Sequence, residues 1–402
     1  MAAREPGFRH RHGRGAASSR RRGGEENTVR VLMVMGNLEV GGAERMALTL
    51  GEGLRKLGVE VQAVALRGGG EMGVAFRNAG IELHEGLLRC RFDFLAVWRV
   101  ARLIRRGRFD AMILVDVYRN AMFCGLWGAR LSGRPIRRIL WCSAVPTGQA
   151  GDFVPRVRKY LRGGMLQRIG CVSRWQRRVL TDYGIPGNCM RVIHNGVDAD
   201  RLTVPAPAAV RAGGDEGAVL VHVANVMPDK DFETLLAAAR KLLARVGRWR
   251  LLLIGRGTDS PGMRRRIEAL GLSETVCPLG LRNDVPEILA SADALICSTR
   301  SEVFNVSVLE AMAVGLPIIT TDVPGFEEMF EDGREGLKTP LADADALADA
   351  IERLLDDPAL RARLSTAGRQ RAEKFRREFM CDKFLELLGS RNGGNGGVAG
   401  IH

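Results

Sequence analysis

The sequence predicts an α/β fold made of two Rossmann-like domains, each built around a parallel sheet. Short apolar runs of strand length alternate with segments of helical periodicity, which is the pattern of repeated strand, helix and strand units. The alternation occurs twice and is interrupted near the middle by a stretch that contains several Pro and Gly residues. A chain of 402 residues with 46% hydrophobic residues is long enough for two domains with a core each.

The first domain is predicted to span residues 29–198. It begins with a strand at 29–35, followed by a loop to Gly42 and a helix at 43–57 that stops at Gly58. The further strands expected here are 60–65, 82–83, 111–115, 139–142 and 169–172, and the further helices are 94–106, 119–131, 154–166 and 175–182. Strands that alternate with helices in this way form a parallel sheet.

The second domain is predicted to span residues 217–376, after a linker at 199–216. Its expected strands are 219–223, 251–254, 294–297 and 318–320, and its expected helices are 232–246, 262–270 and 307–314. The chain from 342 to 388 is expected to be helical. One option for its last helix, 377–388, is that it packs back on the first domain. The ends, 1–28 and 389–402, contain few large apolar residues and are predicted to be disordered.

The net charge of +14 belongs to the first half of the chain, where residues 28–200 hold about twice as many Lys and Arg as Asp and Glu. Arginine-rich clusters occur at 102–108, 134–138, 156–162 and 174–178. Such patches favour phosphate-rich surfaces, either anionic lipid or nucleic acid, while a general preference of the source for Arg is the alternative explanation. Composition does not choose between lipid and nucleic acid.

Composition also limits location and cofactors. No apolar run is long enough to cross a bilayer, and the N-terminus lacks the apolar core of a secretory signal, so we expect a cytoplasmic protein with the inner membrane face as a peripheral location. The eight cysteines are scattered without a C-x-x-C pair and are expected to be reduced. The histidines outside the tails share no ligand-like spacing, and a metal site is not predicted.

The most informative pattern is a pair of carboxylates, Glu302 and Glu310, eight residues apart. The first lies in a polar loop after a predicted strand, and the second lies about one turn inside the following helix. In open parallel sheets, ligands bind beyond the carboxyl ends of strands, where helix amides attract phosphate. The spacing alone also fits a helix-capping glutamate beside a solvated one.

The segments around this pair resemble family 4 retaining glycosyltransferases of the GT-B fold. The region 302–317 is similar to the E-x7-E region of that family. Companion segments occur in the family's order between about residues 29 and 390, namely 41–45, 192–198, 228–236, 251–257, 278–285 and 322–328. The resemblance implies two Rossmann-like domains that face a cleft, with an acceptor-binding N-terminal domain and a C-terminal domain that binds a nucleotide sugar.

The resemblance also implies roles for single residues. Glu310 would accept hydrogen bonds from the ribose, and Glu302 would orient hydroxyls of the transferred sugar. Lys230 would balance the charge of the diphosphate, although a solvated surface lysine is its plain alternative. The remaining donor-side residues are Phe304, Asn305, Val306, Asn225, Arg256, Arg282, Gly41 and Gly42. Glu44, Arg45 and Ser143 are the candidates on the acceptor side.

Three positions depart from the family pattern. Asn225 stands where an arginine is common five residues before the lysine, so Arg256 or Arg282 is expected to supply the missing charge. Val303 replaces the glycine that usually follows the first glutamate. The segment 141–146 contains no histidine where many members have one, and Ser143 is a possible polar substitute there.

The leading functional prediction is a retaining glycosyltransferase that moves a sugar from a UDP- or GDP-sugar to a lipid-linked or membrane-surface glycan. No cofactor is required, because the nucleotide sugar is a co-substrate, and a divalent metal is not predicted. The alternatives are a sugar-nucleotide epimerase or phosphorylase of the same architecture and a non-catalytic homologue that binds nucleotide sugar or nucleic acid. An anionic membrane surface is the favoured partner over nucleic acid. An NAD-dependent dehydrogenase fits poorly, since no complete G-x-G-x-x-G follows the first strand.

Overall fold

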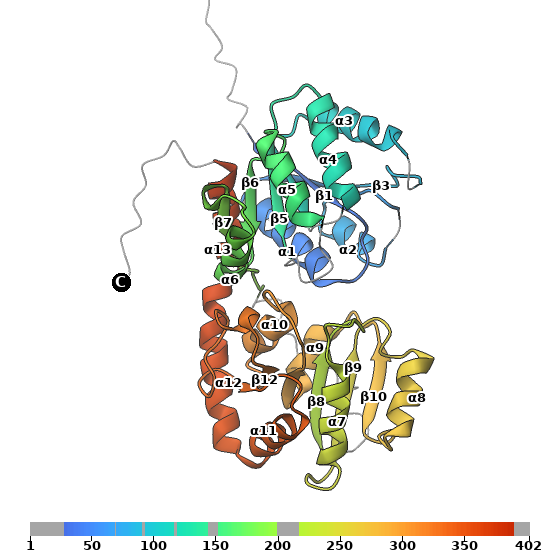
Figure 1. The fold of residues 1–402 in the computed structure, drawn as a ribbon, viewed down its shortest axis with the longest axis vertical. Coiled ribbons are helices and arrows are strands. Elements are labelled where there is room, and N and C mark those ends of the chain that lie inside the picture. Colours follow the sequence, from blue (N-terminus) through green and yellow to red (C-terminus); the bar gives the residue numbers. More distant parts are fainter. Residues whose placement is uncertain are drawn as a thin grey trace, which may run out of the picture.

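The computed structural model describes residues 28–68, 70–90, 93–115, 119–143, 152–198 and 217–389. The predicted tails lie outside these ranges apart from residues 28 and 389, and so does the whole predicted linker, 199–216. Within the described residues the chain forms two α/β domains, one above the other in Figure 1, with the C-terminal helices running along both.

The first domain is built on a seven-stranded parallel sheet with the order β3-β2-β1-β4-β5-β6-β7. Its strands are β1 (Arg30–Met35), β2 (Glu60–Ala65), β3 (Glu82–Glu85), β4 (Ala111–Val115), β5 (Arg137–Cys142), β6 (Arg168–Cys171) and β7 (Met190–Val192). Its helices are α1 (Gly42–Lys56), α2 (Gly73–Asn78), α3 (Leu95–Gly107), α4 (Arg119–Leu131), α5 (Phe153–Arg162) and α6 (Arg174–Asp182). The strand order reverses between β1 and β4.

The second domain has a six-stranded parallel sheet with the order β10-β9-β8-β11-β12-β13. Its strands are β8 (Ala218–Val223), β9 (Trp249–Ile254), β10 (Val276–Gly280), β11 (Ala294–Cys297), β12 (Ile318–Thr321) and β13 (Leu337–Thr339). Its helices are α7 (Phe232–Leu242), α8 (Pro261–Ala269), α9 (Val285–Ser291), α10 (Val306–Val314), α11 (Ala344–Asp356) and α12 (Pro358–Ala372). Here the order reverses between β8 and β11.

This architecture confirms the predicted fold class of two Rossmann-like domains. The elements that the sequence did not reveal are short or lie at sheet edges, namely α2, α9, β7, β10 and β13. Strand β10 contains Pro278, which an edge strand tolerates because one side of its backbone has no partner strand. The helix predicted at 232–246 ends at Leu242, and the helix predicted at 154–166 ends at Arg162.

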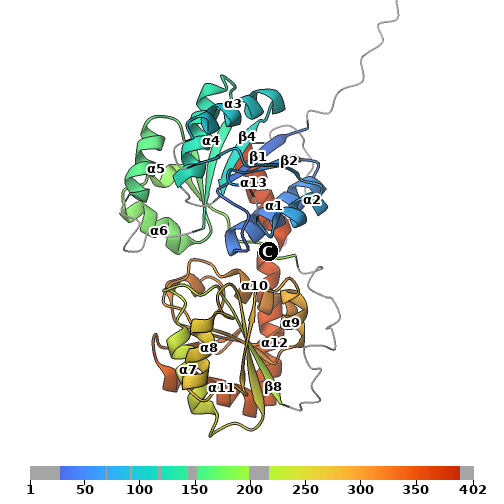
Figure 2. The ribbon, with the colours of Figure 1, turned by 90° about the vertical axis from the view of Figure 1, so that its right-hand side faces the viewer.

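The helical segment predicted at 342–388 consists of separate helices that cross between the domains. Asp357 caps the start of α12, whose first residue is Pro358, so one helix ends and another begins at this point. The last helix, α13 (Arg377–Leu388), packs on α1 of the first domain, as both ribbon views show (Figures 1 and 2).

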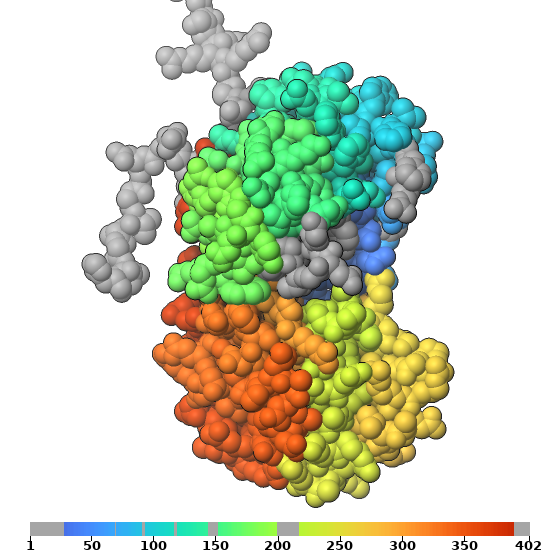
Figure 3. All heavy atoms as spheres, in the orientation of Figure 1, coloured from blue at the N-terminus to red at the C-terminus, as the bar shows by residue number. Residues whose placement is uncertain are grey.

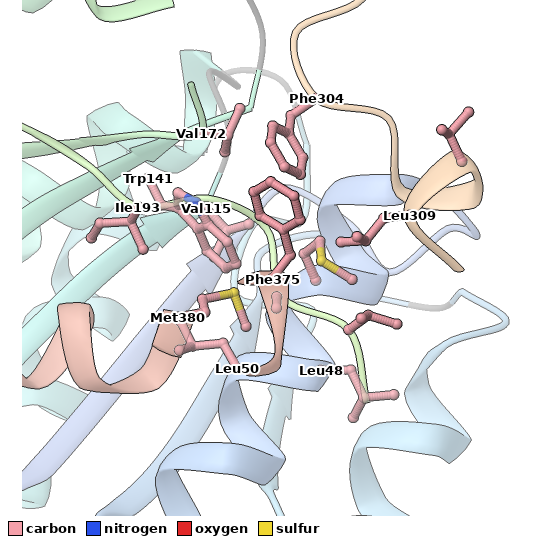
Figure 4. Packing of buried hydrophobic residues seen from close by; sticks show 14 of the residues in the cluster. Leu48, Leu50, Val115, Trp141, Val172, Ile193, Phe304, Leu309, Phe375 and Met380 are labelled. Carbon is pink, nitrogen blue, oxygen red and sulfur yellow. The ribbon is translucent and has the colours of Figure 1, made fainter. Parts of the chain in front are cut away.

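The base of α13 is fixed to the first domain by polar and aromatic contacts. The Arg377 side chain, only 3% exposed, pairs with Asp198 at the end of the first domain. The Phe384 ring meets Trp141 of β5 edge-on, with ring centroids 5.0 Å apart. Figure 4 shows Trp141, Phe375 and Phe304 close together, in a core cluster that contains residues from both domains.

Candidate active site

A cavity of about 300 Å³ lies between the two domains where both sheets reverse their strand order. Its walls come from the loop after β1, the end of β4, the loop after β8 and the segment between β11 and α10. In open α/β sheets such a crevice is the usual place for a ligand. The space-filling view shows the two domains in close contact around this level (Figure 3).

Two helix N-termini face the cavity from opposite domains. Helix α1 begins at Gly42, and α10 begins at Val306. A Cβ atom placed on Gly42 would lie 3.7 Å from Val306 Cγ2, so the two helix starts approach each other closely. Because a helix N-terminus carries unpaired N–H groups and partial positive charge, this arrangement suits an anion such as a diphosphate.

The predicted pair Glu302 and Lys230 is in direct contact on the cavity wall. Lys230 Nζ bonds Glu302 Oε1, and Asn305 Nδ2 donates to the same oxygen over 2.7 Å. Burial of Lys230 disfavours its charge, but the Glu302 carboxylate outweighs this effect and holds the pKa of the ammonium above its ordinary value. A positive charge is therefore kept in the cavity at neutral pH.

Lys230 is positioned by a buried polar network at the ends of β8, β11 and β12. Asp231, 2% exposed, caps α7 by accepting from Thr234 N and also bonds the Arg300 guanidinium. Burial opposes the charge of Asp231, yet the hydrogen bonds from Thr234 and Arg300 leave its pKa below the usual value. The buried Thr299 hydroxyl donates to the Asp229 carbonyl over 3.0 Å. These bonds fix the turn on both sides of the lysine.

The loop from Glu302 to Val306 is held from several sides. Asn305 caps α10, since its Oδ1 accepts from Val308 N over 2.9 Å. Asn195 of the first domain donates its Nδ2 to the Phe304 carbonyl over 3.1 Å. Gly325 lies directly behind Glu302, where a Cβ atom would stand 2.2 Å from the Glu302 carbonyl oxygen. The loop can keep its shape only with a glycine at that position.

Glu310 lies on α10 and reaches the opposite domain. Its Oε1 accepts from Arg45 Nη1 over 3.2 Å, and its side chain is 10% exposed. Both residues line the cavity. The pair therefore connects the helix of the predicted nucleotide-binding carboxylate with α1 of the first domain.

The first-domain wall of the cavity contains part of the predicted acceptor side. Ser143 and Arg45 line it, together with Gly41, which precedes α1. Glu44 is a buried residue in the first turn of α1 and does not belong to the cavity lining. Its carboxylate lies beside Gly41, where a Cβ atom would stand 2.5 Å from Glu44 Oε2.

Asn225, which replaces the common arginine, and Arg282, one of the two arginines expected to supply its charge, both lie at the cavity. Asn225 lines the cavity, donates to the Val40 carbonyl over 3.3 Å and accepts from Arg256 N over 2.9 Å. Arg282 also lines the cavity and is held by Asp284 through two bonds of 2.8 and 2.6 Å.

Arg256 differs from Asn225 and Arg282, because its side chain leaves the cavity. Its guanidinium bonds Glu39 over 2.9 Å and approaches Glu71 at 3.5 Å, both in the first domain. It is absent from the cavity lining formed by the described residues. The geometry thus favours Arg282 over Arg256 as a cation for a ligand.

Sequence reasoning did not assign several residues that the structure brings to the cavity. Asn195 lies in the recognised segment 192–198, but only the fold shows its bond to Phe304. Val115 is the last residue of β4 and Trp141 the last but one of β5, and the buried-strand pattern did not indicate that they face a ligand site.

Within the described residues, no group of three or more His, Cys, Asp or Glu side chains is placed to hold a metal ion. The same part of the chain contains no helix that is long and apolar enough to cross a membrane.

Comparison with known families identifies the class of protein. The fold is that of GT-B glycosyltransferases. Residues 40–201 match the model of Glycosyltransferase Family 4, and residues 210–371 match the model of Glycosyl transferases group 1. The two matches follow each other and cover most of both domains, so the chain belongs to this family of glycosyltransferases.

The chain is similar over most of its length to two curated enzymes. It is 27% identical to the lipopolysaccharide core biosynthesis glycosyltransferase LpsE of Rhizobium meliloti (strain 1021), over 87% of this chain and 96% of that protein. It is 28% identical to a phosphatidyl-myo-inositol mannosyltransferase of Mycobacterium leprae (strain TN), over 83% of this chain and 89% of that protein.

The fold is similar to that of Anabaena Alr3699/HepE, solved in complex with UDP and glucose. The TM-score is 0.79 at 19% sequence identity, covering 90% of this chain and 100% of that one. This likeness establishes the shared fold.

Proposed function

We propose that this glycosyltransferase moves a sugar, with retention of its anomeric configuration, from a UDP- or GDP-sugar to a lipid-linked or membrane-surface glycan. The observation that supports this best is the convergence of two helix N-termini, the cationic Lys230 and the carboxylates Glu302 and Glu310 on one interdomain cavity. A nucleotide sugar presents a diphosphate, a ribose and a sugar, and the cavity offers a group suited to each.

The diphosphate would lie between the start of α1 and the start of α10. Lys230 would balance part of its charge, with Arg282 at the edge of the cavity as a second cation. Because developing charge on a leaving diphosphate is stabilised by cations and oriented N–H groups, these elements would supply the main catalytic effect. The backbone at Gly41 and Gly42 carries no side chain that would keep the phosphates away.

The two carboxylates would divide the rest of the donor between them. Glu310, held on α10, would accept hydrogen bonds from the ribose hydroxyls. Glu302 would orient hydroxyls of the transferred sugar, with Asn305 and Lys230 keeping its carboxylate in place. The proposal of retention rests on the family resemblance: the acceptor would attack from the face of the leaving group, and the diphosphate would take up the proton of the acceptor hydroxyl.

The acceptor assignment has two supports. One named relative acts in lipopolysaccharide core biosynthesis, and the other is a phosphatidyl-myo-inositol mannosyltransferase. Both names point to an acceptor that carries lipid. The first domain, which forms the acceptor side of the cleft, also carries the excess of positive charge along the chain. We therefore favour polysaccharide or glycolipid biosynthesis as the process.

A donor screen tests the proposal. The full-length protein is incubated with UDP- and GDP-sugars and a lipid extract, and nucleoside diphosphate release is measured together with transfer of labelled sugar to lipid. Release that depends on the extract and gives an α-linked product from an α-linked donor supports the proposal. Conversion of the donor without an acceptor product would indicate an epimerase, and no release from any donor would contradict transfer.

A further inference from the structure

The outer side of the first domain carries a group of exposed large apolar side chains on α3 and α4. Trp98 is 55% exposed, and Phe94, directly before α3, is 75% exposed. We call this surface the α3–α4 face; its apolar members are Phe94, Leu95, Trp98, Phe123, Trp127 and Leu131. An exposed apolar group of this size in a folded protein usually marks an interaction surface.

The two helices hold these side chains close together. Helices α3 and α4 lie side by side in both ribbon views (Figures 1 and 2). They approach closely at Gly128, where a Cβ atom would stand 2.6 Å from Val100 of α3. Arg105 of α3 donates to the Leu131 and Ser132 carbonyls at the end of α4, each over 3.1 Å. On α4 itself, the rings of Phe123 and Trp127 are 6.4 Å apart.

The charged side chains within α3 and α4 are all positive, and Asp152, just before α5, lies 3.7 Å from Arg119. Neither helix contains Asp or Glu, whereas α3 carries Arg99, Arg102, Arg105 and Arg106, and α4 carries Arg119 and Arg130. Asp93 pairs with Arg99, while Arg102 lies over the Trp98 ring at 5.5 Å from its centroid. Aromatic rings among arginines form a surface that is at once apolar and cationic.

We propose that the α3–α4 face binds the surface of a bilayer that contains anionic lipid. Tryptophan and arginine both favour the headgroup region, where an apolar ring is buried and a cation meets phosphate. A second copy of the chain fits less well, because two such faces would bring arginines against arginines. Nucleic acid would satisfy the arginines but offers little to side chains such as Leu95 and Leu131.

This inference rests on the proposed function, because it gives the membrane of a lipid-linked acceptor a defined place on the enzyme. Helix α4 begins four residues after Val115, which lines the cavity, and its thirteen residues extend about 20 Å. The face is therefore connected to the acceptor side of the cavity through one helix. In Figure 3 the surface of α3 and α4, coloured cyan to teal, lies on the side of the first domain that faces away from the second.

Vesicle flotation tests the inference with the full-length protein. The wild type is expected to float with vesicles of phosphatidylglycerol and phosphatidylcholine, and to bind pure phosphatidylcholine or high-salt samples far less. Trp98→Ser combined with Trp127→Ser, and separately Arg102→Gln combined with Arg106→Gln, should each lower the partition coefficient at least about tenfold. Phe379→Ser and Arg240→Gln change exposed residues of α13 and α7 and should leave it unchanged.

UDP binding and circular dichroism of the same variants separate this inference from the proposed function. Retained UDP affinity and helicity with lost flotation support the α3–α4 face. Flotation equal to wild type in both double variants overturns it, whatever the donor screen shows. Another outcome is that the wild type binds no vesicles but forms a concentration-dependent dimer in light scattering, and that the double variants lose this dimer. That result would identify a second copy of the chain as the partner and would also overturn the inference.

Discussion

At the scale of single residues, the ion pair of Lys230 and Glu302 lies on the proposed donor side of the cavity. The lysine keeps its charge because the carboxylate raises its pKa against the cost of burial. Glu302 in turn holds the ammonium and the Asn305 amide on one oxygen. A diphosphate that enters the cavity would compete with Glu302 for the lysine. Removal of the charge of Glu302 and removal of the charge of Glu310 should therefore have different effects on UDP affinity and turnover.

Glu302→Gln should lower turnover about 100-fold and leave UDP affinity unchanged or higher. The amide can still accept from Asn305, but it no longer competes with the diphosphate for Lys230. Glu310→Gln should instead weaken UDP binding by about tenfold or more, since the ribose hydroxyls would lose the negative charge of their acceptor. Calorimetric titration with UDP and initial-rate kinetics measure both effects.

Glu327→Gln is a matched control for these variants, because Glu327 is half exposed and pairs with Arg178 away from the cavity. It should change neither property. A larger loss of UDP affinity in Glu302→Gln than in Glu310→Gln would reverse the proposed division of roles.

Several residue positions were predictable from sequence because local motifs carry them. Glu302, Glu310 and Lys230 belong to short segments with a fixed relation to a strand end and a helix start, and all three line the cavity. Arg256 belongs to a similar segment, yet Glu39 and Glu71 draw its guanidinium to the first domain. Pairing between residues so far apart in the chain leaves no local pattern.

At the scale of elements, the segment between β11 and α10 depends on its packing against the turn after β12. Pro324–Phe326 forms a short 3₁₀ helix, and its Gly325 touches the Glu302 backbone. The sequence predicted α10 within a residue of its observed start because apolar residues recur at helical spacing. The sequence could not show that a turn more than twenty residues later fixes the position of the Glu302 loop.

Gly325→Ala should displace Glu302 and reduce turnover about 100-fold. The new Cβ would stand 2.2 Å from a backbone oxygen, which cannot rotate away as a side chain could. The stability of the domain should fall by roughly 1–3 kcal/mol through overpacking. Kinetics and urea unfolding measure the two effects.

Gly262→Ala serves as the control, since no atom lies within 4 Å of a Cβ at that position in α8. It should keep full activity with equal or higher stability. Normal turnover in Gly325→Ala would mean that the Glu302 loop is not set by this contact.

Strand β8 contains a buried histidine that should make stability depend on pH. His222 is fully buried, its Nδ1 donates to the Ile296 carbonyl over 2.8 Å, and burial lowers its pKa to about 4. The unfolded chain binds a proton near pH 6.5. The stabilising effect is therefore complete above pH 6.5 and is lost as the pH falls toward 4, by roughly 3 kcal/mol in total.

Urea unfolding between pH 7.5 and 5 measures this dependence, before most carboxylates begin to titrate. In His222→Leu the slope of unfolding free energy against pH should be smaller than in the wild type, even though the variant is less stable at pH 7.5 through loss of the bond to Ile296. An equal slope in both proteins would show that other groups cause the acid sensitivity.

At the scale of the whole molecule, the two domains are joined across the cleft by residues that also line the cavity. Arg45 reaches Glu310, Asn195 reaches the Phe304 carbonyl, and Asn225 reaches the Val40 carbonyl. The overall architecture was predictable, since the alternation of strands and helices repeats twice. The cross-domain contacts were not, because each joins segments that only the relative placement of two domains brings together.

Arg45→Ala should loosen the closed arrangement and change ligand binding in a specific way. The ribose hydroxyls that we propose bind Glu310 would have to share it with the Arg45 guanidinium, which bonds the same carboxylate. Removal of that guanidinium should therefore strengthen binding of uridine severalfold, while the protein without nucleotide shows a larger radius of gyration in small-angle scattering. UDP should reverse the expansion, because its diphosphate would still bridge the starts of α1 and α10.

Arg256→Ala is the matched comparison, since it also removes an arginine that crosses between the domains. Its partners Glu39 and Glu71 are more than half exposed, and ion pairs of that kind contribute at most about 1 kcal/mol. It should leave uridine affinity within about twofold of wild type. If Arg256→Ala matched Arg45→Ala in uridine affinity, the effect would come from general loss of cross-domain charge pairs; if only Arg45→Ala acted, Glu310 would be identified as the carboxylate that both the guanidinium and the ribose use.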